Sequence, residues 1–110
     1  MTRKPGLRWT LRAAQDLRSI ARYIAQDDPH AARRWVGRLR QRAREAAATP
    51  KAGRRVPEIN RDDIREVLLR SYRIVYCLTD GGILVLTVFE GHRLFPLDAL
   101  RGVGQGTEKK

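Results

Sequence analysis

The feature that most constrains the fold is a stretch in the C-terminal half with three closely spaced runs of β-branched, aliphatic and aromatic residues. The runs are Ile64–Leu69, Tyr72–Thr79 and Ile83–Phe89. This composition is typical of strands. Asp80-Gly81-Gly82 separates the last two runs and supplies the positive φ angles that a tight hairpin turn requires. The stretch therefore predicts a three-stranded antiparallel meander.

Side-chain alternation assigns the two faces of these strands. In the middle strand one face carries Tyr72, Ile74, Tyr76 and Leu78, and the other carries Arg73, Val75, Cys77 and Thr79. We expect the bulkier first face to meet a helical layer. The last strand is apolar on both faces, which indicates an interior position in the sheet. Its two faces are Leu84, Leu86 and Val88 against Ile83, Val85 and Phe89. Arg93 follows this strand, so Arg73 and Arg93 are expected near the same end of the sheet.

Two amphipathic helices are predicted ahead of the strands. The first follows Thr10, a good capping residue, and runs to about Gln26. Its apolar positions are Leu11, Ala14, Leu17, Ile20, Ala21 and Ile24. The second runs from about Pro29 to Ala48, with Asp28 as its N-cap. Its apolar positions are Ala32, Trp35, Val36, Leu39, Ala43 and Ala46, with Trp35 expected as a core anchor. Their short connection predicts an antiparallel helical hairpin.

The remaining segments complete an α+β fold. Leu7–Trp9 is predicted as a short edge strand, Thr49–Asn60 as an irregular connector and Pro96–Leu100 as one helical turn. We expect the helical hairpin to cover one face of a small antiparallel sheet, in the order β-α-α-β-β-β. The other face is expected to be open to solvent or to a partner. Residues 1–100 are predicted to form one domain, and residues 101–110 a disordered tail.

The net charge of +11 is concentrated in residues 1–60, which hold 15 basic and 5 acidic residues. Such a basic layer suits an acidic partner, either nucleic acid or an acidic protein. Because 19 of the 23 basic residues are arginine, solubility combined with a genomic preference for arginine explains the charge equally well. Both interpretations remain open at the level of sequence.

Several classes of protein do not fit this sequence. There is no apolar run of membrane-spanning length and no apolar core of a signal peptide, so a cytoplasmic protein without membrane contact is expected. The single cysteine, Cys77, excludes an internal disulfide and is expected to act as an inert small hydrophobe. His30 and His92 are too isolated to indicate a metal site. No cofactor motif is visible, so none is expected.

Several short motifs, taken in order from Leu7 to Pro96, carry a family resemblance. They are Ala14-Gln15-Asp16-Leu17, Ile20 and Tyr23-Ile24, then Pro50, Gly53-Arg54, Pro57-Glu58 and Ile64-Arg65-Glu66, and finally Tyr72–Tyr76, Val85-Leu86 and Gly91-His92-Arg93. In this order they resemble the RelE/ParE toxin superfamily of bacterial type II toxin–antitoxin systems. The resemblance implies a small toxin that a cognate antitoxin, through an acidic and partly disordered segment, holds inactive.

The two branches of that superfamily imply different activities. RelE-like toxins cleave mRNA on the ribosome with basic residues on the open sheet face and, in many members, a tyrosine near the C-terminus. ParE-like toxins inhibit DNA gyrase without that catalytic set. In this chain Arg73 and Arg93 match the RelE pattern, but Ala99 stands at the tyrosine position. Two lysines of that pattern map near Ile64–Val67, where only Arg65 is basic.

The chemistry of RNA cleavage makes this difference informative. Cleavage requires a base, an acid and cations around the phosphorus. Arg65, Arg73 and Arg93 are candidate cations, but arginine is too basic to exchange protons readily. His92 is the candidate proton carrier, with a hydrogen-bonded loop residue as the simpler interpretation. Arg73 also has a structural alternative, an ion pair across the hairpin with Glu90.

We therefore expect a ParE-like toxin that inhibits gyrase and is neutralised by an antitoxin. The alternative is a RelE-like, ribosome-dependent mRNA endonuclease. A third class is a nucleic-acid-binding module that uses the arginine-rich second helix, although this chain has few aromatic residues for stacking on bases. The expected partner-binding residues are Arg33, Arg34, Arg38, Arg40, Arg42, Arg73 and Arg93.

Overall fold

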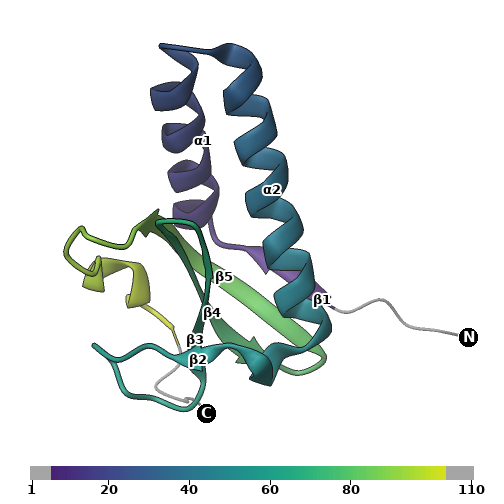
Figure 1. Cartoon of the computed structure of the whole chain (residues 1–110). Helices are drawn as coiled ribbons and strands as arrows, with labels where there is room; N and C mark the ends of the chain where they lie inside the picture. The colour runs from purple at the N-terminus through teal and green to yellow at the C-terminus, as the bar shows by residue number, and fades with distance from the viewer. Residues whose placement is uncertain (1–5, 104–110) are drawn as a thin grey trace, which may run out of the picture.

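The computed structural model describes residues 6–103. A helical hairpin lies on one face of a five-stranded sheet whose strand order is β1-β5-β4-β3-β2 (Figure 1). The elements are β1 (Gly6–Trp9), α1 (Leu11–Ala25), α2 (Pro29–Ala48), the 3₁₀ turn η1 (Pro50–Ala52), β2 (Arg54–Arg55), β3 (Ile64–Leu69), β4 (Tyr72–Thr79), β5 (Gly82–Glu90) and the 3₁₀ turn η2 (Leu97–Leu100). The predicted α+β architecture is confirmed, including the edge strand, the antiparallel meander and the interior position of β5. The sheet is not wholly antiparallel as predicted, because β1 pairs with β5 in parallel. Two short elements within the connector were not predicted, the 3₁₀ turn η1 and the two-residue strand β2.

Side-chain hydrogen bonds cap the N-termini of both helices at the residues predicted from the sequence. The Thr10 hydroxyl accepts a hydrogen bond from the amide of Ala13 at 3.0 Å. The Asp28 carboxylate accepts from the amides of His30 and Ala31 at 3.0 and 3.2 Å. These bonds satisfy amides that have no partner within the helix. No helix in residues 6–103 has the length and apolar character needed to cross a membrane.

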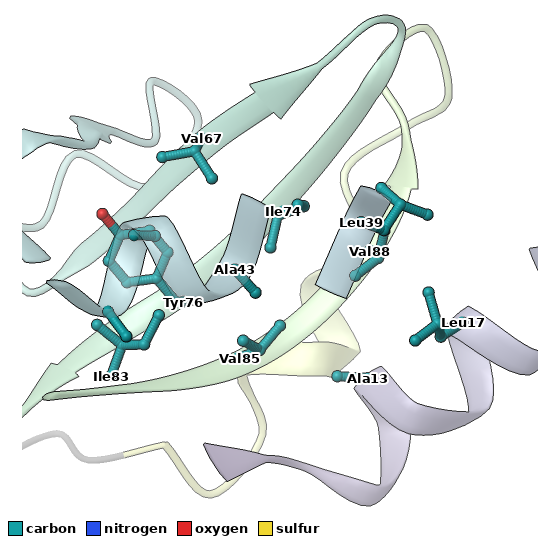
Figure 2. Close-up of a cluster of buried hydrophobic side chains, with 12 residues drawn as sticks. Ala13, Leu17, Leu39, Ala43, Val67, Ile74, Tyr76, Ile83, Val85 and Val88 are labelled. Atoms are coloured by element: carbon teal, nitrogen blue, oxygen red, sulfur yellow. The ribbon is translucent and has the colours of Figure 1, made fainter. Parts of the chain in front are cut away.

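The main core lies between the helices and the sheet (Figure 2). Its buried side chains are Ala13, Leu17, Leu39, Ala43, Ala46, Ala47, Val67, Ile74, Tyr76, Ile83, Val85 and Val88. Two predictions for the helices were wrong. Leu11 is 70% exposed, because the cap at Thr10 sets a helical phase in which Ala13 and Leu17 face the core. Trp35 is only half-buried, and its ring packs on Tyr72 at 5.9 Å between centroids.

A β-bulge in β5 changes which residues share a face. Val75 pairs with Thr87 and Tyr76 with Val85, so Leu86 is the extra residue. An extra residue reverses the alternation beyond it. Val88 therefore joins the core beneath the helices and Phe89 points to the opposite face, so strict alternation assigned these two residues wrongly.

The second face of the sheet is covered, which contradicts the expectation of an open face. Val75, Cys77, Leu86 and their neighbours there contact the connector and the C-terminal segment. The covering residues are Val56, Ile59, Phe95, Leu100 and Val103. Burial raises the pKa of the Cys77 thiol, as fits a residue that serves as a small hydrophobe. Of the tail predicted for residues 101–110, residues 104–110 lie outside the described part of the chain.

Candidate functional site

Arg73, the first of the candidate cations, lies inside an ion-pair network on the second face of the sheet. Its side chain is buried, and its Nε donates to Glu66 Oε1 at 2.7 Å. Its Nη1 and Nη2 donate to the two oxygens of Glu58 at 2.8 Å each. Arg54 completes the network from β2, with its Nε 2.6 Å from Glu66 Oε2. Arg73 thus joins β4 to β3 and to the connector.

The surroundings of Arg73 keep its guanidinium charged and occupied. The group lies 5.1 Å from the ring centroid of Phe89 and 5.6 Å from that of Phe95. Its hydrogen bonds lower the pKa of Glu58 to about 2 and raise the pKa of Arg73. The ion pair predicted between Arg73 and Glu90 was wrong. The turn is Asp80-Gly81, and together with the bulge it places Phe89, not Glu90, opposite Arg73.

Arg65, the second candidate, also has a structural role. Its Nη1 donates to the carbonyl oxygens of Lys51 at 3.0 Å and Gly53 at 2.9 Å. Its Nε and Nη2 donate to the backbone and the carboxylate of Asp62, both at 2.9 Å. These bonds hold the connector against β3 and engage the guanidinium on both of its edges. Ala99, at the position of the family tyrosine, is buried in η2.

His92 and Arg93 are exposed and lie beside α1, at the end of β5. They line a groove of about 840 Å³, which we call the sheet-end groove. Its lining residues are Arg12, Asp16, Ser19, Ile20, Tyr23, Tyr72, Val88, Phe89, Glu90, His92, Arg93, Leu94 and Pro96. Arg93 follows the end of β5 that pairs with the start of β4, so Arg73 and Arg93 lie near the same end of the sheet as predicted, but Arg73 does not line this groove. Arg93 makes no ion pair within residues 6–103, and His92 Nε2 lies 3.9 Å from Glu90 Oε1.

Asp16 fixes the floor of the sheet-end groove, a role that sequence reasoning did not assign. Its Oδ2 accepts hydrogen bonds from the Thr87 hydroxyl and from the amide of Val88, next to the bulge. Arg12 bridges Asp16 at 3.0 Å and Asp98 of η2 at 2.6 Å. The same side chains therefore hold α1, β5 and the C-terminal segment together. The only sequence signal for this role of Asp16 was its position within the Ala14-Gln15-Asp16-Leu17 motif of the family resemblance.

The five α2 arginines predicted to bind a partner fall into two groups. Arg42 is engaged, since it lies 3.2 Å from Glu45 and donates to the carbonyl of Leu68 at 3.1 Å. Arg38 lies over the Trp35 ring, 5.0 Å from its centroid. The other three are exposed and form no ion pair in the described part of the chain. They are Arg33, Arg34 and Arg40.

A second groove, of about 540 Å³, lies between the outer halves of α1 and α2, and we call it the interhelical groove. Its lining residues are Ala21, Arg22, Ala25, Pro29, Ala32, Arg33, Val36, Gly37 and Arg40. It shares no lining residue with the sheet-end groove. Among residues 6–103, no three His, Cys, Asp or Glu side chains are grouped to hold a metal ion.

Comparisons with known proteins identify the family. A family model described as the ParE toxin of the type II toxin–antitoxin system parDE matches residues 7–95. The chain is 37% identical over 100 residues to Y4kP of Sinorhizobium fredii, covering 87% of this chain and 97% of that protein. It is 36% identical over 87 residues to toxin RelE2 of Caulobacter vibrioides, covering 78% and 94%.

A solved structure shows the same fold. A chain of the chromosomal ParDE system from P. aeruginosa matches with a TM-score of 0.65 at 20% identity, covering 79% of this chain and 96% of that chain. The family match spans the helical hairpin, the connector and the whole meander. This chain belongs to the ParE toxin family and is a toxin of a type II toxin–antitoxin system.

Proposed function

We propose that this toxin inhibits DNA gyrase and that a cognate antitoxin holds it inactive. The observation that carries the first part is the buried network around Arg73, whose guanidinium makes three hydrogen bonds to Glu58 and Glu66. A cation held in this way is not free to stabilise a developing charge on RNA. The guanidinium of Arg65 is likewise engaged, because it donates hydrogen bonds to two carbonyl oxygens of the connector.

The alternative, an mRNA endonuclease, draws support from the sheet-end groove, where His92, Arg93 and two tyrosines lie together. Cleavage nevertheless needs two groups that exchange protons near neutral pH. Burial raises the pKa of Tyr72, which moves it further from that range. His92 is then the main candidate for both proton transfers. A gyrase inhibitor needs only a complementary surface, which the exposed arginines and the two grooves offer.

We place the acidic segment of the antitoxin in the sheet-end groove. Tyr23 is 73% exposed and Leu94 is 95% exposed, and both line it. Large exposed apolar side chains beside a free cation, here Arg93, suit an acidic segment that also carries apolar residues. We expect a tight complex whose association slows as salt is added, because the basic helices attract the segment. An association rate indifferent to ionic strength would count against this encounter.

Two assays, one with purified toxin and one in cells, test the proposed target. The toxin is added to purified gyrase to measure supercoiling, and it is expressed briefly in cells to map mRNA ends on translating ribosomes. We expect inhibited supercoiling and no codon-phased ends, with the same result for His92→Ala and Arg93→Ala. Codon-phased cleavage that disappears in either variant, with supercoiling untouched, would replace this proposal with the endonuclease.

A further inference from the structure

The outer half of the helical hairpin stands clear of the sheet (Figure 1). There α1 and α2 pack on each other, and the interhelical groove runs between them. Small apolar side chains, among them Ala21, Ala25 and Ala32, line its floor. Because these side chains are small, the backbone of another element, such as a helix of a partner, can approach the groove closely.

The rim of the interhelical groove is positively charged. Arg33 and Arg40 come from α2 and Arg22 from α1. None of the three forms an ion pair with any residue that the structure describes. Arg22 Nη2 donates a hydrogen bond to the Ser19 hydroxyl at 3.5 Å. An apolar floor between unpaired cations is complementary to an apolar face flanked by carboxylates.

Gly37 provides an independent observation at the same groove. It is exposed in the middle of α2, where glycine is less favourable to the helix than alanine. A Cβ there would meet nothing within 4 Å. Gly53 and Gly82 differ, since a Cβ would clash with the Tyr76 hydroxyl at the first and with the carbonyl oxygen of Gly6 at the second. No contact within the described chain accounts for Gly37, whereas the close approach of a partner backbone does.

We propose that the interhelical groove is the surface with which the toxin engages its target protein, and that it receives an amphipathic helix with acidic flanks. The inference rests on the proposed function in one respect, that the target is a protein. The sheet-end groove, on the opposite flank of α1, leaves the antitoxin a separate site.

The test uses Gly37→Gln, which adds a long side chain at the groove and improves helix propensity. We expect this variant to unfold at a higher urea concentration than the natural chain. We also expect it to bind the antitoxin unchanged and to lose growth arrest, with target affinity reduced at least about tenfold. A gain in stability together with a loss of toxicity separates a binding role from a folding role.

Two charge reversals at the rim of the groove test the same proposal, and a third charge reversal outside the groove is the matched control. Arg33→Glu and Arg40→Glu should each weaken growth arrest. Arg34→Glu changes an arginine that is also exposed on α2 but lies outside the groove, and it should leave growth arrest unchanged. A Gly37→Gln toxin that keeps full toxicity would overturn the proposal. If in that case the charge reversals still abolish toxicity, contact through charge alone, as with a nucleic acid backbone, is the answer instead.

Two further outcomes separate this inference from others. Loss of antitoxin binding in Gly37→Gln would assign the groove to the antitoxin and overturn the proposal. Growth arrest reports on any target, so it does not depend on gyrase. If the natural toxin leaves gyrase active while Gly37→Gln still loses toxicity, the gyrase proposal fails and the assignment of the groove stands.

Discussion

Replacing Arg73 with methionine is the sharpest test of its structural role. Methionine keeps an unbranched apolar stem, so packing against Phe89 and Phe95 largely remains. The substitution removes all three hydrogen bonds to Glu58 and Glu66. Glu66 has no exposed side-chain surface, so its carboxylate would stay buried with one remaining partner, Arg54.

The expected loss follows from that unpaired burial. Breaking a buried ion pair by removing one partner costs about 3–5 kcal/mol of unfolding free energy. We expect the lower end, about 3 kcal/mol, because Arg54 still bonds Glu66 and because the released Glu58 is 41% exposed and can be hydrated. For a domain of this size that is a large part of a total stability of about 5–15 kcal/mol.

Urea denaturation followed by circular dichroism measures this loss, with two comparison variants. Arg93→Met removes an exposed cation that forms no ion pair among residues 6–103, so it should change stability by less than about 0.5 kcal/mol. Adding Glu66→Gln to Arg73→Met should recover at least about 1 kcal/mol, since no buried charge then remains. A loss below about 1 kcal/mol for Arg73→Met, together with loss of toxicity, would refute the reasoning and return Arg73 to the functional site.

Three further predictions concern the core, the edge strand and pH. Leu17→Ala should lower unfolding free energy by about 2–5 kcal/mol, because Leu17 is 3% exposed; a loss under 1 kcal/mol would contradict its burial. Gly82→Ala should loosen β1 by a clash with the Gly6 carbonyl, measured as faster exchange of the β1 amides. The folded pKa of Glu58, about 2, lies below its ordinary 4.5, so the stability from its pairing with Arg73 is complete above pH 4.5 and lost as pH falls toward 2. Glu58→Gln should remove that component from unfolding curves measured across this range.

The sequence alone determined the two helices, the edge strand and the three strands of the meander, and their order, because the signals for them are local. The caps at Thr10 and Asp28 act within three residues, and the turn after Thr79 depends on the conformational freedom of Gly81, whose φ is +82°. The family resemblance rested on the same elements in their order. These local signals do not depend on which distant segments pack together, so the elements that they predict are the ones found in the folded structure.

Only the tertiary structure decided which groups remain available at a site. One extra residue at Leu86 reversed the faces of the residues beyond it, and pairing between strands, not the sequence of one strand, determines where such a bulge forms. The turn at Asp80-Gly81 likewise leaves Phe89, not Glu90, opposite Arg73, and the packing of β3 and the connector brings Glu66 and Glu58 to its guanidinium instead. Glu66 lies in a predicted strand, which indicates that a cation accompanies its buried carboxylate, but that cation, Arg73, comes from the neighbouring strand β4. An arginine is free for function only when long-range packing leaves no carboxylate beside it, and that balance is settled when the layers assemble.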